Sequence, residues 1–373
     1  MLKRLSATSS AAVAVLTLAA CGTGSGQGTQ GMLVWTTYGT GTSTYADVAA
    51  VAEAVTTAGG PDIRVVTSDT AIGRVAPLRE GQAQMGRLGD EYIYAFEGDY
   101  EFAGQEWGPQ EMRVVWGAVA PHGLLVRDDS GIDDFADLEG TDFPRITANP
   151  SVNNKLDAFL AYGGLTRDDV NEVEVDYGQQ AEALETGMID VLFHQVYGPN
   201  LYQLESVFDV RWLSLDEGAD EQIAALEEVA PTVEIGDFTG GPGQAEGQSD
   251  TSLVYALPFA TYADTDEDLV YDTASAIHDN FGAYENSTSN THYWELTAID
   301  SEPKAVPFHP GAVRFLEEQG EWSAEDEARN QELLEREERL QDGWEEFADE
   351  AAGRDTFEVA REWTAWKDEN IPE

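Results

Sequence analysis

The chain has 373 residues, of which 71 are Asp or Glu and 20 are Lys or Arg, so its formal net charge is −51. This charge repels phosphates and excludes a general nucleic-acid-binding protein. The content of 42% hydrophobic and 10% aromatic residues is enough to bury a core, which excludes a disordered acidic chain. Cys21 is the one cysteine in the sequence, so no intrachain disulfide can form.

The acidic residues are spread along the chain rather than gathered in one tail. This pattern favours a halophilic protein, because salt shortens the Debye length and screens the self-repulsion. A cation-binding role or a basic partner is the alternative. The acidic run at residues 264–268 lacks the glycine turn and the distal Glu of a calcium loop, so we expect no metal site and no cofactor.

The beginning of the sequence predicts an export signal. Lys3 and Arg4 precede an apolar stretch, residues 11–18, that is too short to span a bilayer. The run Leu-Ala-Ala-Cys-Gly at residues 18–22 resembles a bacterial lipobox. We therefore predict a lipoprotein signal peptide at residues 1–20, lipidation of Cys21, and a flexible tether at residues 21–31. The protein would be anchored at the outer face of the cytoplasmic membrane, in the periplasm. An ordinary cleavage site with a chance cysteine is the alternative.

Short apolar runs alternate with helical patterns from residue 32 onward, which favours an α/β fold. In a first block we expect strands at residues 32–35, 63–66, 112–119 and 123–127, and helices after Ser43 or Thr44 and at residues 71–78. In a second block, from about residue 128, we expect a helix at residues 151–162 and strands at residues 173–177, 191–194 and 211–215. A strand at residues 251–257 would return to the first block.

The composition changes again at residue 321, where acidic residues become more frequent. Leu333, Leu340 and Phe347 recur every seven residues, which predicts an amphipathic helix that packs on the body of the protein or on a partner.

The familiar motifs of catalytic chemistry do not occur in this sequence. No two of the five histidines have the spacing of a helical metal pair, and the H-E-x-x-H, G-x-S-x-G and G-x-x-x-x-G-K-[ST] patterns are missing. Beside an export signal, this favours a binding protein that is not an enzyme. A lipid-anchored hydrolase that uses a pair of carboxylates, and a surface adhesion or scaffold module, are the alternatives.

Three polar turns are each predicted to join a strand to a helix, at residues 36–45, 68–74 and 147–153. Helix N-termini offer free N–H groups to a carboxylate, and ligands of open α/β sheets bind at the carboxyl ends of strands. The turns therefore predict a cleft between two lobes. The alternative is that their hydroxyl groups only cap the helices.

Four segments resemble the TAXI-family solute receptors of TRAP transporters. They are Tyr38-Gly39-Thr40-Gly41 with Tyr45, residues 80–85, residues 125–132 with 137–140, and residues 305–315, whose Pro-Phe-His-Pro-Gly-Ala run is the most specific. The turn at residues 68–74 departs from the family's pattern, so the ligand is less transferable than the fold. The resemblance implies a two-lobed, type II-like periplasmic-binding-protein fold and a TRAP permease partner driven by an ion gradient. A receptor of an ATP-driven importer, built on the same fold, is the alternative.

On this resemblance, lobe 1 is expected at residues 32–125 and 251–320, lobe 2 at residues 126–250, and acidic C-terminal helices at residues 321–373. The ligand would be a small carboxylate, including glutamate-like compounds. Arg74 is the preferred anion clamp and Arg145 the second candidate, while Asp90 would meet an ammonium or sodium ion. The other candidate ligand-binding residues are Tyr38, Gly39, Thr40, Ser43, Tyr45, Ser68, Thr70, Asn149, Ser151, Asn153, Gln195 and Tyr197.

Overall fold

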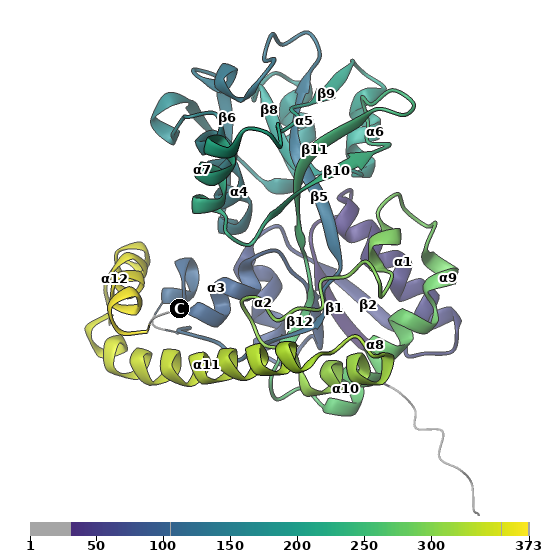
Figure 1. Ribbon diagram of the computed structural model, residues 1–373, viewed down its shortest axis with the longest axis vertical. Coiled ribbons are helices and arrows are strands. Elements are labelled where there is room, and N and C mark those ends of the chain that lie inside the picture. The colour runs from purple at the N-terminus through teal and green to yellow at the C-terminus, as the bar shows by residue number, and fades with distance from the viewer. Residues whose placement is uncertain (1–30, 105, 352, 372–373) are drawn as a thin grey trace, which may run out of the picture. The chain divides into compact units, whose positions relative to one another are not determined.

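The computed structural model describes residues 31–371 except residues 105 and 352 (Figure 1). The predicted signal peptide, the lipidation of Cys21 and the tether up to residue 30 lie outside the described residues. Within the described part of the chain, no helix is both long and apolar enough to cross a membrane.

The first sheet has the strand order β2-β1-β3-β12-β4. Its strands are β1 (Leu33–Thr37), β2 (Ile63–Thr67), β3 (Met85–Arg87), β4 (Met112–Trp116) and β12 (Phe259–Tyr262). β1 runs parallel to β2 and β3, whereas β12 is antiparallel to β3 and β4. The associated helices are α1 (Ser43–Thr57), α2 (Ala71–Arg79), α3 (Glu91–Glu97), α8 (Glu267–Asp279), α9 (Phe281–Tyr284) and α10 (Pro310–Gln319). We call this unit lobe 1.

The second sheet has the order β10-β11-β5-β8, and β9 also pairs with β5. Its strands are β5 (Val119–Arg127), β8 (Val191–Gln195), β9 (Val210–Trp212), β10 (Glu234–Thr239) and β11 (Ser249–Ala256). A separate parallel pair is formed by β6 (Asp142–Ile146) and β7 (Asn171–Val175). The helices are α4 (Pro150–Tyr162), α5 (Gln180–Glu185), α6 (Pro199–Glu205) and α7 (Asp220–Val229). We call this unit lobe 2.

Short 3-10 helices complete the connections in both lobes. They lie at Tyr100–Ala103, Phe135–Leu138, Arg167–Asp169, Tyr177–Gln179 and Thr291–Trp294.

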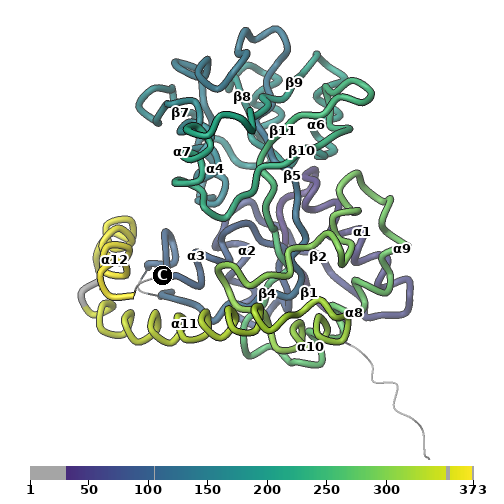
Figure 2. The backbone as a smooth tube through the Cα atoms, viewed as in Figure 1, coloured from purple at the N-terminus to yellow at the C-terminus, as the bar shows by residue number. Residues whose placement is uncertain are grey.

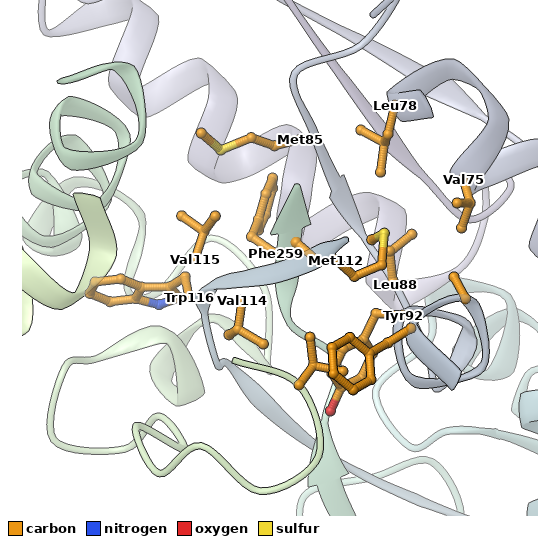
Figure 3. Packing of buried hydrophobic residues seen from close by; sticks show 14 of the residues in the cluster. Val75, Leu78, Met85, Leu88, Tyr92, Met112, Val114, Val115, Trp116 and Phe259 are labelled. Atoms are coloured by element: carbon orange, nitrogen blue, oxygen red, sulfur yellow. The ribbon is translucent and has the colours of Figure 1, made fainter. Parts of the chain in front are cut away.

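Each lobe has its own hydrophobic core, which confirms the predicted two-lobed α/β fold. In lobe 1, Phe259 of the central strand β12 packs edge-on against Trp35, with ring centroids 4.9 Å apart. Figure 3 shows Phe259 and Trp116 among the side chains of this core. In lobe 2, Phe135 stacks on Phe159 at 5.4 Å. The two cores meet at Tyr38 of lobe 1, which packs within the cluster of lobe 2.

The chain crosses between the lobes twice, at residues 117–118 and 257–258. β5 and β11 are antiparallel neighbours and pass side by side toward lobe 1 (Figure 2). The predicted crossings at residues 125–126 and 250–251 are therefore wrong. β5 is one continuous strand, and its residues 119–122 pair with residues 253–256 of β11 in the second sheet. The chain passes from the first sheet to the second between β4 and β5, at Gly117, and the hydrophobic pattern alone does not reveal this change of sheet.

The C-terminal helices α11 (Ala324–Ala351) and α12 (Thr356–Asn370) pack on lobe 1, as Figure 1 shows for α11. Leu333, Leu340 and Phe347 are buried, so the predicted amphipathic helix docks on its own body. Two groups of ion pairs fix it there. The Glu337 carboxylate accepts two hydrogen bonds from the Arg113 guanidinium. The carboxylate of Glu97, at the end of α3, pairs with Arg336 and Lys367, and its backbone carbonyl accepts a hydrogen bond from the indole N–H of Trp363.

We expect Gly117→Ala to destabilise the protein at the first crossing. A Cβ on Gly117 would lie 1.9 Å from the carbonyl oxygen of Asp300. The Asp300 backbone cannot easily move away, because its N–H donates to the Gly117 carbonyl. The free energy of unfolding should fall by about 1–3 kcal/mol in a denaturant titration. Gly282→Ala is the control, because nothing lies within 4 Å of its added Cβ. Equal effects of the two substitutions would contradict this account of the crossing.

The ion pairs of Glu97 should make stability depend on pH. Burial by itself raises the pKa of Glu97, but the hydrogen bond from Arg336 and the charge of Lys367 outweigh burial and lower the pKa below 4.5. The stabilisation is therefore complete above the unfolded pKa and is lost as the pH falls through the folded pKa. Glu97→Gln should cost about 3 kcal/mol of unfolding free energy at pH 7.

The gap between the wild type and Glu97→Gln should shrink in urea titrations below about pH 4.5. Comparing the two proteins at each pH cancels the general loss of acidic self-repulsion on protonation. Glu335→Gln, at an exposed position of α11, serves as the control and should show a small gap at every pH. A pH-independent gap for Glu97→Gln would argue against the ion-pair account.

Candidate binding site between the lobes

The three predicted polar turns lie where the lobes meet, and their side chains cap helices. Thr42 accepts a hydrogen bond from the N–H of Tyr45, Thr70 from Gly73, and Asn149 from Val152, each at 3.2 Å. Two of the turns also contact each other across the lobes. The Ala71 N–H donates to the Ala148 carbonyl at 3.1 Å, and the Asn149 amide donates to the Asp69 carbonyl at 3.3 Å.

Gly39 of the first turn is tied to the second, because its N–H donates to the Asp69 carboxylate at 3.2 Å. A Cβ on Gly39 would lie 2.7 Å from that oxygen, so a side chain here would push the Asp69 carboxylate away from the Gly39 N–H. Thr40 is exposed and Ser43 is buried. The Ser43 hydroxyl has no hydrogen-bond partner within the described residues.

Arg74 is completely buried and points at the first turn. Its Nε donates to Glu91 at 2.6 Å, its Nη1 donates to the Ser68 carbonyl at 2.9 Å, and its guanidinium carbon lies 3.7 Å from the ring centre of Tyr38. Tyr38 in turn packs on Tyr177 of lobe 2, at 5.2 Å between ring centroids. Arg74 Nη2 and Glu91 Oε2 have no partner in the described part of the chain.

Asp90, at the start of α3, is joined to the first turn of α4 in lobe 2. The Asp90 N–H donates to the Ser151 hydroxyl at 2.9 Å, and the Lys155 ammonium contacts the Asp90 carboxylate. Lys155 also lies 5.0 Å from the ring centre of Tyr255. Both charged groups are buried, so this is an ion pair across the lobes in place of the predicted ammonium or sodium ion at Asp90.

Asp47 of α1, which the sequence did not single out, is the centre of a second network across the lobes. Its Oδ1 accepts from Thr288 at 2.6 Å, and its Oδ2 accepts from Asn290 at 2.7 Å and from Gln195 of lobe 2 at 3.3 Å. The Thr44 hydroxyl donates to the other end of the Gln195 amide at 2.9 Å. Burial raises the pKa of Asp47, and these hydrogen bonds oppose that shift.

Arg87, the last residue of β3, is a second completely buried guanidinium that the sequence analysis missed. Its Nη1 donates to the Ala118 carbonyl at 3.0 Å, and its guanidinium carbon lies 4.6 Å from the ring centre of Trp294. Nε and Nη2 are without partners among the described residues. A basic residue at the carboxyl end of a short apolar strand, in the run Met-Gly-Arg-Leu-Gly-Asp, was the signal that could have found it.

Two histidines of lobe 2 complete the region as neutral, stacked rings. Burial lowers the pKa of His122 to about 3, although its bond to the Ala120 carbonyl opposes the shift. Burial likewise lowers the pKa of His194 to about 4. His122 stacks on Tyr255 at 4.5 Å and His194 on Tyr177 at 4.8 Å. The described residues contain no cluster of three or more His, Cys, Asp or Glu side chains able to hold a metal ion.

Several predicted site residues are not brought into this region as free polar groups. Arg145 is half exposed on β6 and pairs with Glu172 at 3.1 Å. The Asn153 amide is bonded to both the N–H and the carbonyl of Ile146. The Tyr197 hydroxyl donates to the Thr239 carbonyl within lobe 2 at 2.9 Å.

The Lys155–Asp90 pair should stabilise the closed arrangement of the lobes. Lys155→Met leaves the Asp90 carboxylate buried without its counter-ion, which costs about 3–5 kcal/mol. We therefore expect an increased radius of gyration in small-angle X-ray scattering without added ligand. The double variant Asp90→Asn with Lys155→Met removes both charges and should recover much of the closure. Arg145→Met, at an exposed ion pair, should leave the scattering unchanged, and an unchanged profile for Lys155→Met would refute this role.

Comparison with known proteins gives one family and several structures. Residues 35–320 match the model of the NMT1-like family. No curated protein sequence is significantly similar to this chain.

Solved structures with a similar fold include the periplasmic aliphatic sulphonate binding protein SsuA from Escherichia coli, which is 14% identical with a TM-score of 0.40. The match covers 77% of this chain and 90% of the SsuA chain. Another is the amino acid ABC transporter substrate-binding protein AbpA from Streptococcus pneumoniae bound to L-arginine, which is 12% identical with a TM-score of 0.40 and covers 73% of this chain and 98% of its own. At these values the similarities carry no argument about the ligand.

Proposed function

Since the chain belongs to the NMT1-like family, whose model spans both lobes, we propose that it is an extracytoplasmic solute-binding protein. It captures a small, carboxylate-bearing metabolite between lobe 1 and lobe 2 and releases it unchanged. The bound form docks on a membrane permease.

The observation that carries this proposal is the set of buried, unpartnered polar atoms between the lobes. Arg74 Nη2, Arg87 Nε and Nη2, and Glu91 Oε2 are all buried, and none has a hydrogen-bond partner in the described part of the chain. Buried polar groups in folded proteins are almost always paired, and an unpaired charged donor is more costly than a neutral one. A ligand with acidic oxygens would supply the missing acceptors for the guanidinium of Arg87, which pairs with no carboxylate among the described residues.

Lobe closure is the mechanism that fits the contacts. Three hydrogen bonds connect the lobes and can form only while the lobes are closed: Thr44 with Gln195, Asp90 with Ser151, and Asn149 with the Asp69 carbonyl. A ligand shifts the equilibrium toward this state by the difference in its affinity for the closed and open forms. The two strand crossings are short enough to serve as the hinge.

The resemblance to TAXI-family receptors favours a TRAP permease driven by an ion gradient as the partner. Lipidation at Cys21 would hold the protein at the outer face of the cytoplasmic membrane, and the acid excess would adapt it to a salty medium. A receptor of an ATP-driven importer is the alternative. Neighbouring genes for a large multi-span permease support the first assignment, and a gene for an ATPase supports the second.

Calorimetry and scattering on the full-length protein in molar salt test the function. We expect at least one compound in a panel of amino acids, dicarboxylates and monocarboxylates to bind in the micromolar range or tighter, about −8 kcal/mol. The same compound should reduce the radius of gyration of an opened variant such as Lys155→Met. Mass spectrometry should recover the compound chemically unchanged. Recovery of a hydrolysed product would instead assign an enzyme.

A further inference from the structure

Arg87 stands apart from the other buried guanidinium groups because no carboxylate of the described residues forms an ion pair with it. Arg74 pairs with Glu91 at 2.6 Å, and Arg113 makes a bidentate pair with Glu337. Within the described residues, Arg87 has no ion pair, and one of its five N–H groups is used, toward the Ala118 carbonyl. A fully buried cation that no carboxylate contacts is unfavourable, so its unpartnered N–H groups call for acceptors from outside the described residues.

The two free nitrogens of Arg87 are the ones that a carboxylate uses. Nε and Nη2 lie on the same edge of the planar guanidinium, and their parallel N–H groups match the two oxygens of a carboxylate. Nη1, on the other edge, is already bonded to the backbone, which fixes the plane of the group. The face of Trp294 beneath the guanidinium restricts it further. The side-on edge is therefore pre-oriented, and no acceptor from the described part of the chain bonds to it.

Asp47 balances this charge from a distance without occupying that edge. Its charge acts on Arg87, while its two oxygens accept hydrogen bonds from Thr288, Asn290 and Gln195. Burial lowers the pKa of Arg87 to about 10, and Asp47 opposes the shift. Because Gln195 comes from lobe 2, one of the three hydrogen bonds to the Asp47 carboxylate crosses between the lobes.

Resting on the proposed function, we propose that Arg87 anchors the carboxylate of the ligand and determines the preference for acids over their neutral analogues. Arg74, already neutralised by Glu91, is a positioning residue that holds the ring of Tyr38 at the lobe interface. The chemical class is a compound with a planar carboxylate presented to lobe 1.

The test compares acids with their neutral amides. Succinate with succinamide, and L-glutamate with its diamide, are titrated by calorimetry into the full-length wild type, Arg87→Gln, Arg87→Lys and Arg74→Gln. The wild type should prefer the acid by about 100-fold or more, since a buried charge pair is lost with the amide. Arg87→Gln should reduce that preference to within about threefold. Arg87→Lys keeps the charge but loses the paired N–H edge and should weaken binding of the acid by about tenfold.

Arg74→Gln is the matched control, because it removes a buried guanidinium from the same lobe interface. It should keep a preference for the acid of at least about 30-fold, even where its affinity for both compounds falls. A full preference retained in Arg87→Gln, or one lost in Arg74→Gln instead, overturns the inference and leaves the proposed function in place.

Melting curves of each variant separate loss of folding from loss of binding. If Arg87→Gln does not fold, Arg87→Lys decides, and an unchanged affinity for the acid overturns the inference. Failure of the wild type to bind either acid or either amide, with no compound co-purified in native mass spectrometry, overturns the proposed function and the role of Arg87 with it.

Discussion

The loss of hydration by ionised side chains is the constraint on which the region between the lobes depends. Arg74, Arg87, Asp47 and Glu91 are completely buried there, and each loses several kcal/mol of solvation when the lobes meet. Contacts within the protein offset much of this desolvation cost: Arg74 pairs with Glu91, and three donors bond to Asp47. Arg87 keeps Nε and Nη2 without acceptors among the described residues, and this is the cost that the proposed ligand carboxylate would offset.

The α/β topology delivers these groups to one place. The carboxyl ends of β1 and β3 bring Tyr38 and Arg87 to the same edge of the first sheet, and the N-termini of α1 and α3 begin there. Lobe 2 contributes Ser151 at the N-terminus of α4 and Gln195 at the end of β8. The polar turns contribute by capping the helices, which fixes the directions of α1, α2 and α4.

The C-terminal helices are fastened to lobe 1 by ion pairs and hydrogen bonds. The side chains of Arg113, Glu97 and Glu111 in lobe 1 bind α11 or α12. The acidic outer surface of α11 adds charge far from the interlobe region, where salt screens it.

The sequence by itself determined what local physics controls. The alternation of apolar runs with helical patterns predicted the α/β class, and a seven-residue recurrence predicted the buried stripe of Leu333, Leu340 and Phe347. The polar turns pointed to Arg74 and Ser151, whereas Asp90 and Gln195 were candidates on the family resemblance. Tertiary structure alone decided which charges meet. Lys155 pairs with Asp90, and Arg145 pairs with Glu172. Arg87 and Asp47 were not predicted, because the residues that they contact lie far along the chain. The continuous strand β5 and the crossing at Gly117 that precedes it were likewise not predicted, because the sheet to which a strand belongs depends on long-range pairing that no local pattern encodes.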